Sequence, residues 1–224
     1  PFKKTTSMAL AKRVKTLEIK QKADDKATER KRQYQENIVN MNNVWQVATN
    51  FLINTQHGTA GQGTNTAGRI RIGDSVNLRS SSINFHCYIP RGSDGVPVFL
   101  DMSTRCRVLL VDNLDNIRGL GAGDILQNTA YPLVSPYKSQ VETGKRYRVL
   151  GDFKFNLNST NKADHQFKWK MPLPKSGRVV NYDGDAANPS DLNVSLIWFC
   201  KSISPLSAGQ PTMEYYVNTA FEDK

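Results

Sequence analysis

Alternating apolar and polar residues dominate the chain after residue 41, and this period of two predicts β-strands. The clearest run is 76–89, with a kink or bulge expected at the serines 80–82. The other expected strands are 44–53, 105–111, 146–157, 166–171, 179–182, 192–200 and 213–221. Turns separate these eight runs and no helical pattern interleaves them, so we predict an all-β fold, a single eight-stranded antiparallel jelly roll of two sheets. The strand count alone leaves an immunoglobulin-like or other sandwich open.

One long segment, 114–140, breaks the alternation. It contains Gly119, Gly121 and Gly123, and later Pro132 and Pro136, and it reads as an irregular insertion between strands. Such insertions often carry partner sites. We therefore take 114–140, together with the loops 58–68 and 183–191, as candidate subunit contacts or outer surface.

Residues 1–40 have a different character and form the first of two predicted units, a basic α-helical arm, followed by a jelly-roll domain at 41–224. The arm lacks Gly and is rich in Ala, Leu, Lys, Arg, Gln and Glu, which favour helices. Leu10, Val14 and Leu17 lie at i, i+4 and i+7, on one helix face. A stripe this narrow does not stabilise an isolated helix. The arm is therefore disordered, docked on its own domain, or bundled with copies of itself through these three residues.

Positive charge concentrates on the arm. It carries eleven Lys and Arg against five Asp and Glu, a net +6 of the +10 of the whole chain. Such an arm is expected to hold a polyanion, in a salt-dependent and largely sequence-independent way. The candidate phosphate contacts are Lys12, Arg13, Lys15, Lys20, Lys22, Lys26, Arg30, Lys31 and Arg32. On the body, Arg69 and Arg71, or Lys168 and Lys170, are candidates to extend this lining, with plain solvent exposure as the alternative for the lysine pair. For the arm, the alternative is a solvated tail without a partner. A nuclear-localisation role is compatible with nucleic-acid binding by the same residues.

No membrane partner and no catalysis are expected. The chain has no apolar run of 18 residues, its three His lack a metal-binding spacing, and no Gly-x-Ser-x-Gly motif occurs. Asp183, Asp185 and Asp191 are weak candidates for a structural calcium site, although Asp is also an ordinary turn residue. No other cofactor is expected. The three Cys, at 87, 106 and 200, lie in apolar runs and are expected to be buried free thiols.

The order of the segments resembles a known family. After the basic arm come RIRIGDSVNLRSSSINFHCYI at 69–89, RVLLVDNLDN at 107–116, KRYRVLGDFKFNLN at 145–158, MPLPKSGRVVNYDGD at 171–185 and LNVSLIWFCKS at 192–202. Together they resemble the coat proteins of satellite tobacco necrosis virus and the similar capsids of small circular single-stranded DNA viruses. The likeness is weakest at 114–140 and 183–191.

The resemblance implies a viral capsid protein that self-assembles into a small icosahedral T=1 shell of about 60 copies. It also implies arms that point inward, cluster near threefold axes and package single-stranded viral genomic RNA or DNA. The expected partners are thus further copies of the chain and the genome. The expected location is the virion and, during assembly, the host cell, with the nucleus implied for a DNA genome. A non-viral nucleic-acid-binding β-sandwich with a basic tail is the alternative. A cupin enzyme lacks its His and Glu metal set here, and a lectin leaves the arm unexplained.

Overall fold

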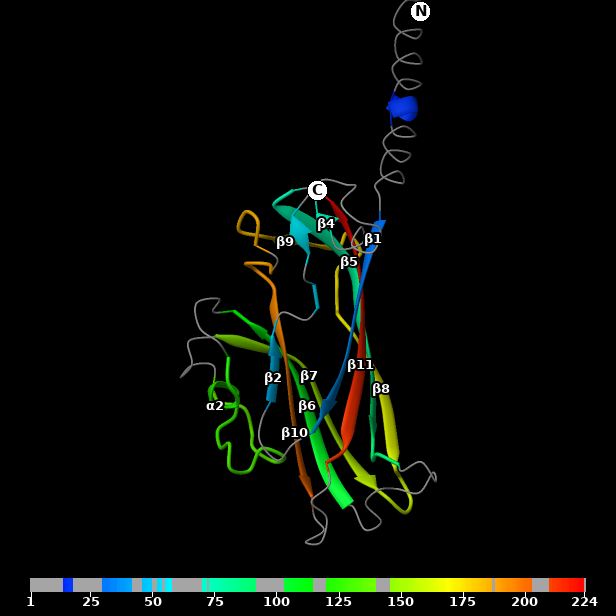
Figure 1. Cartoon of the computed structure of the whole chain (residues 1–224). Coiled ribbons are helices and arrows are strands. Elements are labelled where there is room, and N and C mark those ends of the chain that lie inside the picture. Colours follow the sequence, from blue (N-terminus) through cyan, green and yellow to red (C-terminus); the bar gives the residue numbers. More distant parts are fainter. Residues whose placement is uncertain are drawn as a thin grey trace, which may run out of the picture.

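The computed structural model describes residues 14–17, 30–41, 46–49, 52–53, 55–57, 70–71, 73–91, 103–114, 120–139, 146–186, 188–202 and 210–223. Within them, antiparallel strands form two sheets that face each other (Figure 1). The elements are β1 (Arg30–Asn40), β2 (Gln46–Thr49), β3 (Gln56–His57), β4 (Ile70–Arg71), β5 (Ser75–Tyr88), β6 (Ser103–Asn113), α2 (Ala122–Ile125), β7 (Tyr147–Asn158), β8 (Asp164–Lys170), β9 (Arg178–Asn181), β10 (Asn193–Ser202) and β11 (Thr212–Asp223).

The strand order identifies the architecture. Sheet A has the order β1-β11-β5-β8, with β9 also on β5, and sheet B has the order β2-β10-β6-β7. Strands β8 and β9 pair with different stretches of β5, and β3 pairs only with β4. Without β3, β4 and β9, the first strand pairs with the last, the second with the seventh, the third with the sixth and the fourth with the fifth. This nested antiparallel pairing is that of a jelly roll, so the predicted fold class is confirmed.

The N-terminal member of sheet A corrects the predicted arm. Residues 30–40 are not helical, because β1 pairs with β11 from Arg30 opposite Glu222 to Asn40 opposite Thr212. Helix propensity is a weak preference that tertiary pairing overrides. The inward-facing positions of β1 include Lys31 and Gln33, so the apolar alternation that marks the other strands is missing.

The eight predicted runs therefore differ in one member from the eight jelly-roll strands. The run 179–182 corresponds to β9, a four-residue strand that pairs with the first residues of β5 and is not one of the eight jelly-roll strands. The eighth jelly-roll strand is instead β1, which the sequence pattern did not predict as a strand. The predicted irregularity in the long strand lies next to the serines. Ser80 pairs with Ala220 and Leu78 with Phe221, which leaves Arg79 as the extra residue of a bulge.

The main core lies between the two sheets. Inward-facing side chains of β5 and β11 meet those of β6 and β10, and Leu78, Ile83, Leu110 and Leu196 are all 0% exposed. Aromatic rings close the side of the core near β7 and β8, where Phe85 and Phe167 stack with centroids 4.6 Å apart. This burial holds the two sheets together, because apolar area removed from water is the main stabilising contribution in folding.

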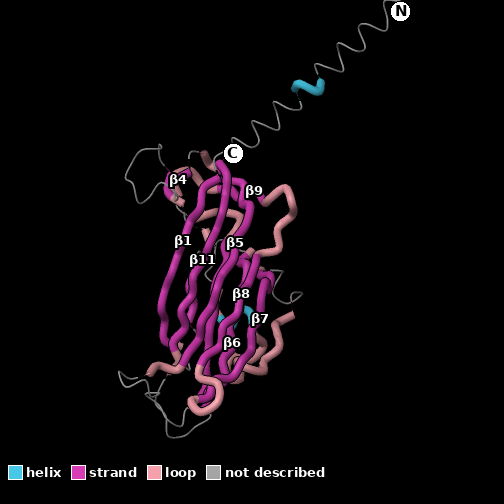
Figure 2. Tube along the Cα trace, turned by 90° about the vertical axis from the view of Figure 1, so that its right-hand side faces the viewer, coloured by secondary structure: helices cyan, strands magenta, loops and turns pink. Residues whose placement is uncertain are grey.

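A second core covers the outside of sheet B. The segment 120–139, which includes α2, places Leu120, Ile125 and Leu126 against Leu109 and Ile197 of the sheet. The segment has little regular structure besides α2 and an isolated bridge, as its sequence predicted. Among the described residues, no comparable layer covers the outer face of sheet A, and Figure 2 shows its strands side by side at the surface.

No helix in the described part of the chain is both long and apolar enough to cross a membrane.

Two glycines near β9 give a matched test of the backbone. Gly177 has φ +83° and Gly184 has φ +55°, both in the left-handed region. A Cβ on Gly177 would meet Asn77 Oδ1 and lie 2.8 Å from the Leu78 carbonyl oxygen, whereas a Cβ on Gly184 meets nothing within 4 Å.

We predict that Gly184→Ala lowers the free energy of unfolding by about 1–2 kcal/mol, the cost of a left-handed residue with a Cβ. Gly177→Ala should cost a further ~1–3 kcal/mol, because the methyl group overpacks against β5. Urea unfolding of both variants measures the difference. Equal losses would mean that the contact with Leu78 is relieved without cost.

Candidate nucleic-acid interface

Of the segment 1–29, which precedes β1, the structure describes only residues 14–17, which are helical and carry exposed side chains. Val14 is 48% exposed and Leu17 64% exposed, so these two residues are not buried against the described part of the chain. Lys15 is exposed as well. The other arm candidates lie outside the described residues: Leu10, Lys12, Arg13, Lys20, Lys22 and Lys26. Bundling of the arms stays a prediction.

The three cationic residues at 30–32 do not lie on the same face of the strand that contains them. Because side chains alternate along β1, Arg30 and Arg32 are exposed while Lys31 points inward and is 8% exposed. The Lys31 ammonium donates a hydrogen bond to the Ile70 carbonyl oxygen at 3.1 Å and forms an ion pair with Asp223. Lys31 is therefore occupied inside the protein, which corrects its prediction as a phosphate contact.

A shared carboxylate lies beside Arg30. The Glu222 side chain, 7% exposed, accepts a hydrogen bond from Arg79 Nε at 2.6 Å, and its other oxygen lies 3.4 Å from Arg30 Nε. Arg79 also donates to the Ser176 carbonyl oxygen at 2.7 Å. Two guanidinium groups thus share one carboxylate, which leaves a local excess of one positive charge where the arm joins the body.

The outer face of sheet A continues from these arginines toward β8. The register places Tyr34, Asn218, Ser82 and Lys170 in one row across the four strands, and Glu36, Tyr216, Asn84 and Lys168 in the next. We call the surface made by these two rows and the three arginines the arm-proximal face. Its members are Arg30, Arg32, Arg79, Tyr34, Glu36, Ser82, Asn84, Lys168, Lys170, Tyr216 and Asn218. Both lysines are exposed, on the side of β8 opposite Phe167 and Trp169.

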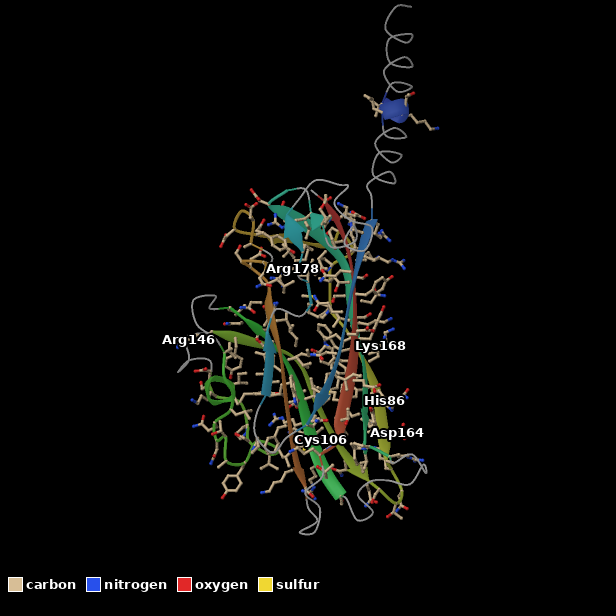
Figure 3. The ribbon with its side chains drawn as sticks, in the orientation of Figure 1. His86, Cys106, Arg146, Asp164, Lys168 and Arg178 are labelled. Atoms are coloured by element: carbon tan, nitrogen blue, oxygen red, sulfur yellow. The ribbon has the colours of Figure 1, made fainter. Side chains whose placement is uncertain are left out.

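The other end of the same face is acidic. His86 Nδ1 lies 3.6 Å from Glu214 and its Nε2 lies 3.9 Å from Asp164, while the Tyr88 hydroxyl donates to Glu214 at 2.8 Å. Figure 3 places Lys168, His86 and Asp164 in this order along the outside of the sheet. A shallow groove of about 810 Å³ lies between the two ends, lined by residues that include His86, Glu214 and Ile38, which is 66% exposed. The charge on this face is therefore unevenly distributed. It is positive near the start of β1 and negative at the far end.

Arg71, a candidate for the basic lining, is buried and has a structural role. Its side chain is 0% exposed, lies 4.2 Å from the ring centroid of Tyr182, and donates hydrogen bonds to the carbonyl oxygens of Gly73, Gly184 and Ala186. The prediction that Arg71 lines a polyanion site is wrong, because its guanidinium binds the loop after β9 instead. Arg69 lies outside the described residues.

A second buried arginine fixes the covering segment of sheet B. Arg107, 2% exposed, donates from Nε and Nη2 to the two oxygens of Asp152 at 2.9 and 2.8 Å. Its Nη1 donates to the carbonyl oxygens of Pro132 at 2.6 Å and Ser135 at 3.0 Å. The Tyr137 hydroxyl donates to the same carboxylate at 2.6 Å. We call these contacts of Arg107 with Asp152, Pro132 and Ser135, together with that of Tyr137 on Asp152, the Arg107 latch. Sequence reasoning missed it, because Arg107 occurs within an ordinary strand pattern.

The latch changes the acidity of its members. Burial by itself would raise the pKa of Asp152, but the hydrogen bonds from Arg107 and Tyr137 hold that pKa below its ordinary value. Burial and the hydrogen bond to Asp152 raise the pKa of Tyr137 to about 12. The carboxylate is thus charged and the phenol neutral at physiological pH.

The calcium candidates do not converge. The Asp191 carboxylate accepts hydrogen bonds from the backbone and side-chain nitrogens of Asn181 at 2.9 and 2.7 Å, and the Asp183 carbonyl oxygen accepts from the backbone of Ala186 at 3.1 Å. Asp185 lies in the turn between them. Within the described ranges, no three His, Cys, Asp or Glu residues form a group suited to a metal ion.

The three cysteines are buried free thiols, as the sequence predicted. Cys87, Cys106 and Cys200 are buried and not disulfide-bonded, and Cys106 lies directly opposite Cys200 in the register of β6 and β10. Burial raises the pKa of Cys87 to about 12 and that of Cys200 to about 11. The thiols are therefore protonated and unreactive core residues at neutral pH.

The strand order and the exposed cations define the class of molecule, a jelly-roll domain with a basic N-terminal segment. No family model and no curated protein matches this chain. Among solved structures, the chain is similar to a chain of turnip yellow mosaic virus, with 10% identity, a TM-score of 0.42, and coverage of 88% of this chain and 94% of that chain.

Two further matches have the same character. The decameric BFDV capsid protein shares 11% identity at a TM-score of 0.38, over 88% of this chain and 98% of that chain. A chain of sacbrood virus of honeybee shares 10% identity at a TM-score of 0.38, over 87% of each chain. With similarity this low, the fold assignment rests on the strand order alone. The finer resemblance to satellite tobacco necrosis virus stays a prediction.

The Arg107 latch predicts a pH dependence of stability. Because the folded pKa of Asp152 is lowered, its stabilisation is complete above the ordinary value of 3.8 and is lost as the pH falls through the lowered pKa. We expect Asp152→Asn to reduce the free energy of unfolding at pH 7 and to flatten its decline in acid, measured by urea unfolding between pH 2 and 7. Asp164→Asn, at a carboxylate that is 64% exposed, is the control. A slope in acid identical to that of the unmodified protein would contradict the assignment.

Proposed function

We propose that this chain is a viral capsid protein with a structural, non-enzymatic role, which self-assembles into a small icosahedral T=1 shell and packages a single-stranded genome with its basic N-terminal segment. The observation that carries the proposal is the junction at Arg30. There the cationic segment 1–29 passes directly into β1, which is an integral strand of the jelly roll. Each copy thereby links one polyanion-binding segment to one rigid, shell-forming unit.

The segment 1–29 also carries a net positive charge. Residues 1–29 carry eight Lys and Arg against four Asp and Glu, a net charge of +4. A shell of about 60 copies would bring on the order of 240 positive charges to one enclosed volume. Lys12, Arg13, Lys15, Lys20, Lys22 and Lys26 are the proposed phosphate contacts of the segment, and Arg30 and Arg32 continue them on β1. Digestion of the extracted nucleic acid with RNase or DNase identifies the genome.

We propose that the covering segment 120–139 supplies part of the contact between copies. The inner side of this segment packs against sheet B, but on its outer side Tyr131 is 63% exposed and Val134 is 73% exposed. Exposed apolar side chains that lie together commonly mark association surfaces. The Arg107 latch holds the backbone beneath them at Pro132 and Ser135, so the surface is presented by a fixed segment.

We expect the purified chain to form uniform closed particles, visible by negative-stain electron microscopy and by size-exclusion chromatography with light scattering. Tyr131→Ser combined with Val134→Ser should weaken assembly, because it removes apolar contact area without touching the core. Lys154→Ser, an exposed change on β7, is the control. A monomer or dimer at every salt and protein concentration would overturn the shell and favour a nucleic-acid-binding sandwich with a basic tail.

Two N-terminal deletions, of residues 1–29 and of residues 1–40, distinguish the role of the arm in binding from the role of β1 in folding. Removal of 1–29 should leave a folded domain that retains much less nucleic acid than the full-length chain, measured by the ratio of absorbance at 260 and 280 nm. Removal of 1–40 should also unfold the domain, because it strips β11 of its partner β1, and circular dichroism during heating detects this loss. Full nucleic-acid content in the 1–29 deletion would contradict the role of the arm.

A further inference from the structure

We propose that the arm-proximal face is a second binding surface for single-stranded nucleic acid. In it, Tyr34 and Tyr216 stack on bases, and Arg32, Lys168 and Lys170 bind phosphates. The inference rests on the proposed function, which assigns nucleic acid to the arm, and it adds a site on the folded body with a different chemistry. The arm supplies long cations, whereas this face combines cations with aromatic rings.

The aromatic pair is the feature that distinguishes this face. The rings of Tyr34 and Tyr216 lie 5.7 Å apart between centroids and are tilted by 33°, on the adjacent strands β1 and β11. Tyr34 is 41% exposed and Tyr216 is 38% exposed, so parts of both rings remain open to solvent. Exposed aromatic rings on a sheet are the usual platforms for unpaired bases, because every base has a π-face that stacks.

Cations lie on both sides of the pair. Arg32 precedes Tyr34 by two residues on the same face of β1, and Lys170 and Lys168 end the rows of Tyr34 and Tyr216 on β8. With strands about 4.8 Å apart, the lysines lie roughly 10–14 Å from the two rings. A strand of a few nucleotides spans that distance, so bases on the rings and phosphates on the lysines are compatible. Ser82, Asn84 and Asn218 lie between them and offer neutral hydrogen-bond donors.

The charge pattern of the whole face selects the occupant and its path. The arm-proximal face carries five cations against Glu36 and Glu222, whereas Glu214 and Asp164 make the far end acidic. A polyanion is attracted to the first end and repelled from the second. A two-fold contact between two copies centred on the Tyr34–Tyr216 pair would bring the cations of one copy against those of the other, which disfavours a symmetric protein contact at this position. The arm joins the body at Arg30, at this positive end, so a nucleic-acid strand bound by the arm starts next to this surface.

Photo-crosslinking of the full-length chain tests the site directly. We expect a thymidine oligonucleotide that carries 5-iodouracil to crosslink to Tyr34 or Tyr216, with the attachment sites mapped by mass spectrometry. Crosslinks confined to residues 1–29, with binding intact, would overturn this inference and leave the proposed role of the arm standing. Absence of both binding and crosslinks would overturn the two together.

Substitution separates stacking from charge. Tyr34→Leu combined with Tyr216→Leu should weaken binding of oligothymidine on the order of tenfold and leave binding of an abasic oligonucleotide unchanged, since only stacking is lost. Tyr34→Phe combined with Tyr216→Phe, which keeps both rings and removes only the hydroxyl groups, is the matched control and should bind both oligonucleotides like the unmodified chain. Equal effects on the two oligonucleotides, no effect on either, or a defect in particle formation alone would overturn the proposal.

The phosphate contacts have their own measurement. Lys168→Gln combined with Lys170→Gln should reduce the slope of log affinity against log salt by about 1.4, the value for two phosphate contacts on a single strand. Arg105→Gln combined with Lys154→Gln removes the same charge from the outside of sheet B, where both residues are exposed, and should leave the slope nearly unchanged. Equal changes in the two pairs would mean that only overall charge matters and would overturn the site.

Discussion

The position of β11 in the middle of sheet A is the constraint on which the rest of the structure depends. This C-terminal strand is hydrogen bonded to β1 on one side and to β5 on the other, and its inner residues, Met213, Val217 and Phe221, belong to the main core. Arg30 and Glu222, which meet at one end of the β1–β11 pair, are 192 residues apart in the chain. Such distant pairing carries a large loop-closure cost before its contacts form, so sheet A is completed only when both ends of the chain are present. The same pairing anchors the basic N-terminal segment to the jelly roll.

Burial divides the positive charges of the body into two groups. Lys31, Arg71 and Arg107 are buried and bind main-chain carbonyl oxygens, an aromatic ring or carboxylates. Each one ties together segments that are remote in sequence, which is useful because an unpaired buried charge is strongly destabilising. The second group is exposed and includes Arg32, Lys168 and Lys170 on one face of sheet A as well as Arg105 and Lys154 on the outside of sheet B. The cations of the body that are open to a polyanion are thus fewer than the composition suggests.

The two sheets present different outer surfaces for a physical reason. Sheet B has apolar residues on both faces, as the continuous burial of Val108 to Val111 shows, so it needs a cover, and the segment 120–139 provides it. Sheet A has mostly polar or aromatic residues on its outer face, with Ile38 an exception, and this face tolerates water without a cover. One side of the molecule therefore carries an added layer with exposed apolar groups, and the other carries an open, charged sheet.

What the sequence determined by itself is what depends on local alternation. The strands β5 and β8, the inward direction of Phe167 and Trp169, and the burial of the three cysteines all follow from a period of two, which places alternate residues on opposite faces. Only the tertiary structure decided the fate of β1, whose inward Lys31 and Gln33 hide the period and whose helix-forming residues favour another conformation. It also decided that Arg71 and Arg107 are internal clamps, since their partners come from loops far away in sequence. A residue's neighbours across a sheet or beneath a loop are set by long-range pairing, and that information is absent from the local pattern.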